Sequence, residues 1–159
     1  MSIRLQVSLR QQLLYLHTDT GVRSYPVSTA LAGAGERDGS GCTPRGRHYI
    51  RACIGSGAPI GAVFVGRRLT GEVYTPELAL RYPRRDWILT RILWLCGLEP
   101  GFNRGGRVDT QRRYIYIHGT PDTEPMGVPL SHGCIRMRND DLLELYEQVS
   151  PGTEILIEE

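Results

Sequence analysis

Apolar and polar side chains alternate from residue 3 to residue 9. Alternation with a period of two is typical of a strand that buries one face. Residues 13–17 and 22–27 continue in this style, and a turn-forming Thr-Asp-Thr-Gly sequence separates them. The pattern therefore predicts that the chain opens with a meander of short antiparallel strands.

Short apolar runs separated by turn-forming residues continue along the chain. They predict four further strands, at 48–54, 62–65, 113–117 and 153–157. Residues 32–46 and 97–106 are rich in Gly and other loop-forming residues, which predicts two long surface loops.

Two segments have the spacing of amphipathic helices. The apolar residues of 86–96 fit one helix with Asp86 as its N-terminal cap. A second helix is predicted from Asn139 to about Val149. Many short strands with only two helices predict a mainly β fold, a β-sandwich or barrel with two or so peripheral helices.

Composition and charge exclude several classes of function. The 159 residues, 40% hydrophobic and 23% charged, fit a single domain over residues 1–159. All 19 basic residues are Arg, which excludes Schiff-base catalysis and the phosphate-binding P-loop because both require a lysine. A net charge of +2 does not favour nucleic acid as a partner.

The chain is expected to be cytoplasmic, with no membrane partner. Polar residues interrupt the apolar positions of 1–16 before an export signal can form, and the best apolar run is only 92–98. No CxxC pair is present, so a zinc ribbon is disfavoured and free thiols are expected at Cys42, Cys53, Cys96 and Cys134.

Candidate chemistry concentrates in one segment, IHGTPDTEPMGVPLSHGCIRMRNDD. A cysteine nucleophile needs a nearby imidazole or amide dipoles to ionise it. We expect His118 to be the base for Cys134, and the backbone carbonyl of Gly119 to orient the imidazole. The amides of His132, Gly133 and Cys134 are predicted to form an oxyanion hole.

HGT at 118–120, Gly127 and SHGCIRM at 131–137 together resemble the signature of the L,D-transpeptidase catalytic domain family, also called YkuD-like. The resemblance extends over nearly the whole chain, through QLLYL at 12–16, YPVST at 25–29, TPRG at 43–46, NDD at 139–141 and PGT at 151–153. Residues of about 84–112 do not align with the family core and are interpreted as an inserted loop and helix.

The resemblance implies a cysteine-dependent acyl transfer on peptidoglycan stem peptides. Cys134 would attack the carbonyl of the L-centre of diaminopimelate, release the terminal D-alanine and hold the tripeptide as a thioester. The residues implied to contact the substrate are Ser131, His132, Arg136 and Tyr116. Carbapenem-type β-lactams are implied as acylating inhibitors, and no cofactor or metal is expected.

The acyl acceptor decides the product. Because no export signal is visible, we expect water as the acceptor, which gives an L,D-carboxypeptidase that trims muropeptide tetrapeptides in murein recycling. One alternative is an L,D-transpeptidase that forms crosslinks in the periplasm. The other is a non-catalytic protein that binds muropeptides, or that binds a metal through His118, His132 and Cys134.

Charge is unevenly distributed along the chain. Residues 81–113 contain eight Arg and three acidic residues, whereas 139–159 contain seven acidic residues and no basic one. The basic region is interpreted either as a solvated face or as a lid that attracts an anionic muropeptide.

Overall fold

A computed structural model describes residues 2–159. The first five strands are β1 (Arg4–Ser8), β2 (Leu13–Thr18), β3 (Gly21–Ser28), β4 (Gly46–Ile54) and β5 (Ala62–Val65). The other five are β6 (Arg68–Val73), β7 (Ile88–Gly97), β8 (Tyr116–Gly119), β9 (Ile135–Met137) and β10 (Glu154–Glu158). Two α-helices, α1 (Pro76–Arg81) and α2 (Asn139–Gln148), and a short 3₁₀ turn (Gly106–Val108) complete the fold.

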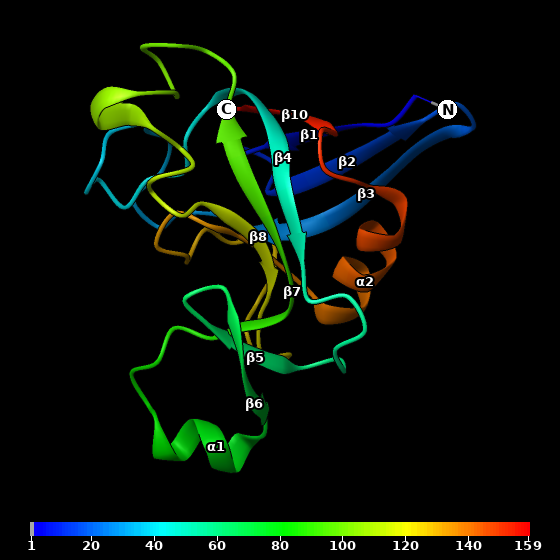
Figure 1. The fold of residues 1–159 in the computed structure, drawn as a ribbon, viewed down its shortest axis with the longest axis vertical. Coiled ribbons are helices and arrows are strands. Elements are labelled where there is room, and N and C mark those ends of the chain that lie inside the picture. The colour runs from blue at the N-terminus through cyan, green and yellow to red at the C-terminus, as the bar shows by residue number, and fades with distance from the viewer. Residues whose placement is uncertain (1) are drawn as a thin grey trace.

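Eight of the strands close into a barrel (Figure 1). Their hydrogen-bonded order is β4-β10-β1-β2-β3-β9-β8-β7, and pairing of β4 with β7 closes the ring. The pairs β1–β10 and β8–β9 are parallel, and the remaining pairs are antiparallel. The mainly β prediction is therefore confirmed, and the barrel is the form that the structure takes.

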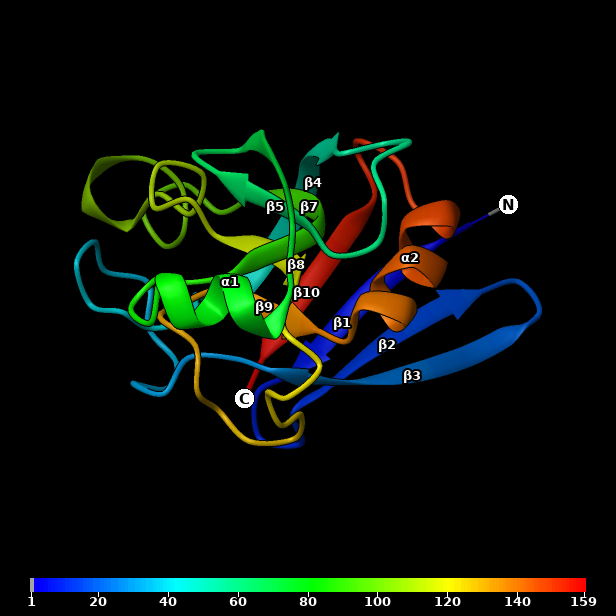
Figure 2. The same cartoon turned by 90° about the horizontal axis from the view of Figure 1, so that it is seen from below.

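The hairpin of β5 and β6 extends the sheet beyond the barrel. It pairs with the first residues of β7, where Val63 lies opposite Leu89. Figure 1 shows α1 beyond this hairpin, at one end of the molecule, and in Figure 2, seen from below, the same helix lies in front of the barrel. The helix begins where the Thr75 hydroxyl accepts a hydrogen bond from the Leu78 amide, and it has no buried residue.

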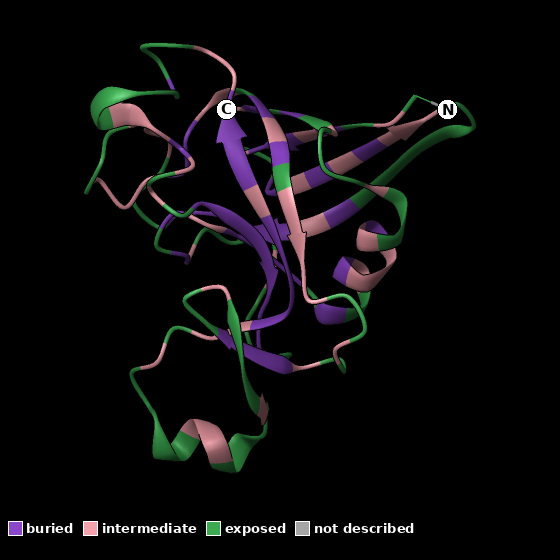
Figure 3. Ribbon diagram, viewed as in Figure 1, coloured by how far each residue is buried: buried purple, intermediate pink, exposed green. Residues whose placement is uncertain are grey.

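Two apolar clusters hold the fold together (Figure 3). The larger fills the barrel, and Leu142 and Leu145 of α2 pack into it. The smaller consists of Ala62, Phe64, Ile92 and Tyr116, with Cys134 among the partly buried residues packed against it. Burial of these side chains is the dominant favourable contribution to folding.

The predicted helix at 86–96 is wrong, because Ile88–Gly97 is a strand of the barrel wall. β7 is covered on both faces, so its sequence lacks the alternation that marks a half-buried strand. The register also shifts between Leu89 and Ile92, where Thr90 has φ +76°. This irregularity changes the phase of the apolar positions and imitates helical spacing. Region 84–112 thus supplies a barrel strand and not an inserted helix.

Most other predicted elements are confirmed with small changes at their ends. The strand expected at 113–117 lies at Tyr116–Gly119 instead, because a turn occupies 111–114. The second predicted helix corresponds to α2. Three short elements, β6, α1 and β9, have no counterpart among the predicted elements.

Candidate active site

His118 and Cys134 are brought to one site by the parallel pairing of β8 and β9. In this register Ile117 lies opposite Ile135 and His118 opposite Arg136, and Cys134 directly precedes β9. Both side chains line one cavity of about 410 Å³. The residues that the sequence suggested as base and nucleophile therefore share a pocket.

The imidazole of His118 is buried and fixed in one tautomer. Its Nδ1 lies 2.6 Å from the carbonyl oxygen of Gly119. A carbonyl only accepts hydrogen bonds, so Nδ1 carries the proton of the neutral ring and Nε2 keeps its lone pair. Burial lowers the pKa of His118, although the Gly119 carbonyl and Asp86 act in the opposite direction. The ring is thus neutral at pH 7, as a general base must be.

The thiol of Cys134 is bound by backbone groups at the start of β8 and just before it. The Tyr116 amide donates to Sγ over 3.3 Å, and the thiol donates to the carbonyl oxygen of Tyr114 over 3.4 Å. Burial raises the pKa of Cys134 to about 12; Asp86 raises it further, whereas the Tyr116 amide and Arg136 lower it. Burial therefore favours a neutral thiol in the resting site.

A hydroxyl-bonded turn precedes the thiol and shapes its backbone. Oγ of Ser131 accepts from the Gly133 amide at 3.2 Å and donates to the Cys134 carbonyl at 2.5 Å. Oγ1 of Thr43 donates to the Gly133 carbonyl at 2.9 Å. Within residues 2–159, the amides of His132 and Cys134 have no hydrogen-bond partner. Two of the three expected oxyanion donors are therefore unpaired, whereas the Gly133 amide is already bonded.

Gly133 is the residue that this turn requires. Its φ is +130°, a conformation that side chains disfavour. A Cβ here would lie 3.2 Å from Cδ1 of Ile115 and 3.3 Å from the carbonyl oxygen of Cys42. The loop after β3 therefore packs directly against the turn that carries the thiol.

The cavity combines expected residues with others that sequence analysis missed. The expected lining residues are His118 and Cys134 together with Tyr116, Ser131, His132 and Arg136. Arg113, at the end of the basic region 81–113, also lines the cavity, as do two charged residues that were not singled out for the site, Arg67 and Asp86. Arg67 lies in the β5–β6 turn and Asp86 was assigned to a helix cap, so neither had a sequence signal that linked it to the motif.

Asp86 connects the α1 segment to the pocket through two basic side chains. Its Oδ1 lies 3.3 Å from a terminal nitrogen of Arg136, and its Oδ2 lies 3.7 Å from Nδ1 of His132. Arg136 is 9% exposed, whereas the side chain of His132 is 79% exposed. Arg136 therefore has a structural partner in the resting site, and His132 forms part of the rim.

Asn139 supports the strand that carries the imidazole. Its Oδ1 accepts from the Thr90 hydroxyl at 2.6 Å, and its Nδ2 donates to the Thr120 carbonyl at 2.9 Å. Gly119 packs against Asn139 and Leu89. A Cβ on Gly119 would overlap Oδ1 of Asn139 and lie 2.6 Å from the Leu89 carbonyl oxygen. Close packing at this point fixes the carbonyl that orients His118.

Comparison with known families decides the assignment of the chain. The sequence model of the L,D-transpeptidase catalytic domain matches residues 2–157. The chain belongs to this family. The resemblance seen in the HGT and SHGCIRM motifs is thereby confirmed, and the barrel described above is that of an L,D-transpeptidase domain.

Individual relatives match this L,D-transpeptidase domain over shorter segments. YqjB of Bacillus subtilis strain 168, assigned by name to the L,D-transpeptidases, is 42% identical over 57 residues, 36% of this chain and 31% of YqjB. YbiS of Escherichia coli strain K12, named a probable L,D-transpeptidase, is 44% identical over 43 residues, 27% of this chain and 14% of YbiS. The matches thus span less than a third of either relative.

Solved L,D-transpeptidase structures share the fold over nearly the whole chain. L,D-transpeptidase 3 from Mycobacterium tuberculosis, in complex with a faropenem-derived adduct, has a TM-score of 0.61 at 16% identity, covering 99% of this chain and 60% of that one. LdtMt1 in complex with imipenem has a TM-score of 0.56 at 16% identity, covering 98% and 58%. At this identity the likeness establishes the fold.

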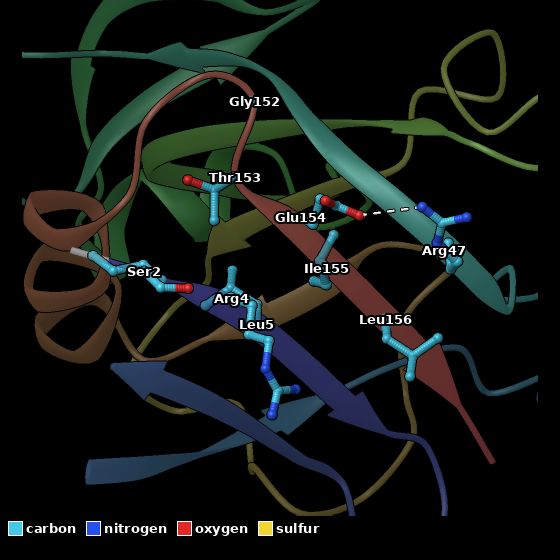
Figure 4. A pocket seen from close by; sticks show the side chains of 10 residues that line it. Ser2, Arg4, Leu5, Arg47, Gly152, Thr153, Glu154, Ile155 and Leu156 are labelled. Carbon is cyan, nitrogen blue, oxygen red and sulfur yellow. Dashed lines mark hydrogen bonds and ion pairs between the residues drawn. The ribbon is translucent and has the colours of Figure 1, made fainter. Parts of the chain in front are cut away.

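A second cavity of the L,D-transpeptidase domain lies away from the motif residues. It measures about 460 Å³ and is bordered by β1 and β10, where Arg47 lies 3.4 Å from Glu154 (Figure 4). It contains none of the expected site residues. Within residues 2–159, no three His, Cys, Asp or Glu side chains are grouped to hold a metal ion, and no helix has the length and apolarity to cross a membrane.

Proposed function

We propose that this L,D-transpeptidase domain catalyses cysteine-dependent acyl transfer on peptidoglycan stem peptides, with water as the preferred acceptor. The observation that carries the proposal is the placement of Cys134 and His118 in one cavity, with Nε2 of the imidazole unprotonated and two amides beside the sulfur unpaired. Family membership supports the same class of reaction.

In the acylation half-reaction, Cys134 is the nucleophile and His118 the base. Sγ bonds to the carbonyl carbon of the L-centre of diaminopimelate, and the thiol proton passes to Nε2 of His118. Negative charge on the carbonyl oxygen is stabilised by the free amides of His132 and Cys134. The C–N bond then breaks, the imidazolium protonates the leaving D-alanine, and a thioester remains on Cys134.

A neutral Cys134 thiol and a neutral His118 imidazole in the resting site suit this sequence of steps. Because burial keeps the Cys134 pKa high and the His118 pKa low, the proton moves when the carbonyl is in place and not before. The Tyr116 amide that donates to Sγ then stabilises the sulfur as negative charge develops.

The sizes of the cavities support water as the acceptor. The cavity at Cys134 is about 410 Å³, within the range of a site for one small ligand. Beyond the Asp86–Arg136 ion pair, a second hollow that also borders His132 measures about 140 Å³. That hollow is below the usual range of a ligand pocket, roughly 300–1,000 Å³, which favours water over a second stem peptide. Hydrolysis of the thioester gives an L,D-carboxypeptidase.

The product of a monomeric stem tetrapeptide tests this proposal. We expect purified protein in H₂¹⁸O to release D-alanine and a tripeptide with one ¹⁸O in its new carboxylate. Cys134→Ser should release neither, whereas Cys53→Ser, altered on β4 outside the pocket, should match the parent protein. Dimeric peptide without free tripeptide would overturn the choice of water and favour crosslinking.

β-Lactams are proposed as covalent inhibitors of the same thiol. Two relatives of this fold have been seen with a faropenem-derived adduct and with imipenem. An activated lactam carbonyl placed like the substrate carbonyl would acylate Cys134 and remain attached. The expected cytoplasmic location and role in murein recycling stay predictions, which fractionation and analysis of accumulated wall tetrapeptides in a deletion strain would test.

A further inference from the structure

Three guanidinium groups line the Cys134 cavity, and two of them are held by an ion pair or by oxygens of a neighbouring loop. Arg136 forms its ion pair with Asp86. Arg113 donates at 2.6 Å to the Cys42 carbonyl and at longer distances to other oxygens of the loop 35–42. Both of these cations therefore bind groups of the protein itself. The third cation, Arg67, is the one to consider as a ligand-binding group.

Arg67 is the lining cation without an acidic partner. No carboxylate within residues 2–159 lies within ion-pair distance of its guanidinium. Its one side-chain hydrogen bond in that range runs from Nη1 to the Tyr116 hydroxyl, 3.0 Å away. A guanidinium has five N–H donors, so most of its capacity remains unused.

The guanidinium is nevertheless held firmly at the cavity. Its Cζ lies 4.8 Å from the ring centroid of Trp94 and 4.7 Å from that of Tyr114. Nε1 of Trp94 is itself fixed by a hydrogen bond of 3.1 Å to the Gln111 carbonyl. Arg67 follows Gly66 in the tight β5–β6 turn, and both have positive φ, +64° and +57°. A cation placed in this way loses little freedom when an anion binds.

Arg67 is also close to the reacting atoms. Tyr116 contacts Arg67 through its hydroxyl and Cys134 through its amide, so one tyrosine side chain separates the guanidinium from Sγ. Both residues line the same cavity, and three residues of extended peptide span roughly 10 Å. A carboxylate one or two positions from the attacked carbonyl can therefore reach it.

We propose that Arg67 is a specificity-determining residue that binds a free carboxylate of the donor peptide next to the scissile bond. The inference rests on the proposed function and deepens it, because it names the substrate class: peptides that are anionic at this position. The two residues joined by the scissile bond each carry one free carboxylate, at the C-terminus of the tetrapeptide and on the diaminopimelate side chain. The planar guanidinium binds either in the same bidentate manner.

Calorimetric binding to Cys134→Ser, which needs no turnover, tests the proposal. The probes are the stem tetrapeptide and two forms of it, each with one of these carboxylates amidated. We expect one amidation to weaken binding about 10- to 100-fold, the usual worth of a hydrogen-bonded charge. When Arg67→Gln is added, the ratio of the dissociation constants of the amidated and unmodified tetrapeptides should be close to 1. Arg68→Gln, which removes the same charge from an exposed position in the same hairpin, should preserve it.

The outcomes separate this inference from the proposed function. The amidated tetrapeptide that binds more weakly than the unmodified one identifies which carboxylate Arg67 binds. An unchanged ratio in Arg67→Gln, an equal loss in Arg68→Gln, or no binding of any probe would overturn the proposal. If the carboxylate preference depends on Arg67 but the parent protein releases no D-alanine, the proposed function fails and this inference stands.

Discussion

The Tyr116 amide donates a hydrogen bond to Sγ of Cys134 over 3.3 Å, and this contact joins the strand that carries the imidazole to the residue that carries the thiol. It favours negative charge on the sulfur, whereas burial of the same sulfur opposes it. Burial has the larger effect, so the thiol is protonated at rest. The reactivity of Cys134 therefore depends on proton removal within the site.

Alkylation by iodoacetamide should report this protonation state. Because the pKa of Cys134 is raised to about 12, its thiolate fraction grows about tenfold per pH unit across the neutral and mildly alkaline range. We expect the alkylation rate of Cys134, measured by peptide mass spectrometry, to rise without a plateau between pH 7 and 10. The other cysteines in the same digest are internal controls. A plateau below pH 9 would show that the thiolate is the resting form.

Asp86 should lower the reactivity of the Cys134 thiol, because its negative charge raises the Cys134 pKa. Asp86→Asn removes that charge and leaves Arg136 without its ion pair. We expect Cys134 to be alkylated about 3- to 10-fold faster at pH 8, where a tenfold change corresponds to about one pKa unit. Glu72→Gln breaks the nearby Arg85–Glu72 pair, 2.8 Å long and outside the cavity, and should leave the rate unchanged. Slower alkylation in Asp86→Asn would contradict this electrostatic account.

Asn139 should matter for both stability and turnover. Asn139→Ala leaves the Thr120 carbonyl and the Thr90 hydroxyl without their partner, which costs about 1–3 kcal/mol of unfolding free energy. It also loosens the packing at Gly119, so kcat should fall more than KM rises. Asp140→Ala changes the next residue of the same helical turn, which is exposed, and should change neither quantity. Equal effects of the two variants would assign the loss to the helix as a whole.

Acid should destabilise the fold through His48. This buried ring contacts the Gly46 carbonyl and the Thr110 hydroxyl, and burial lowers its pKa to about 4. The unfolded value is 6.5, so the stabilisation is complete above pH 6.5 and is lost as pH falls to about 4. The loss of unfolding free energy amounts to about 3 kcal/mol, at roughly 1.4 kcal/mol per pKa unit.

Urea unfolding at pH 7, 5 and 4 measures this contribution. His48→Gln should be less stable than the parent protein at pH 7, and its stability should decline less with acid. His132→Gln, altered at an exposed ring, should follow the parent curve. Identical acid slopes for His48→Gln and the parent would show that other groups control the decline.

The fold was predictable where strands have one buried face and not where they have two. β1 and β2 alternate clearly, and the sequence located these two strands and β3 to within one or two residues. β7 is buried on both faces and interrupted at Thr90, so its spacing imitated a helix. β9 has three residues, too few for any period to be visible.

The candidate site was predictable where its residues are adjacent in sequence. The Ser131–Cys134 turn and the His118–Gly119 pair lie within recognisable motifs, and the structure brings them together. Arg67 and Asp86 reach the cavity from the hairpin and from the segment after α1, so only tertiary structure could reveal them. The protonation state of the thiol depends on burial, which the sequence does not encode locally.

Intact-protein mass spectrometry after exposure to imipenem tests the central claim most directly. We predict a single covalent adduct that peptide mapping places on Cys134, present in Cys42→Ala and absent in Cys134→Ala. A folded protein that forms no adduct, or an adduct that persists in Cys134→Ala, would contradict the assignment of this sulfur as the nucleophile.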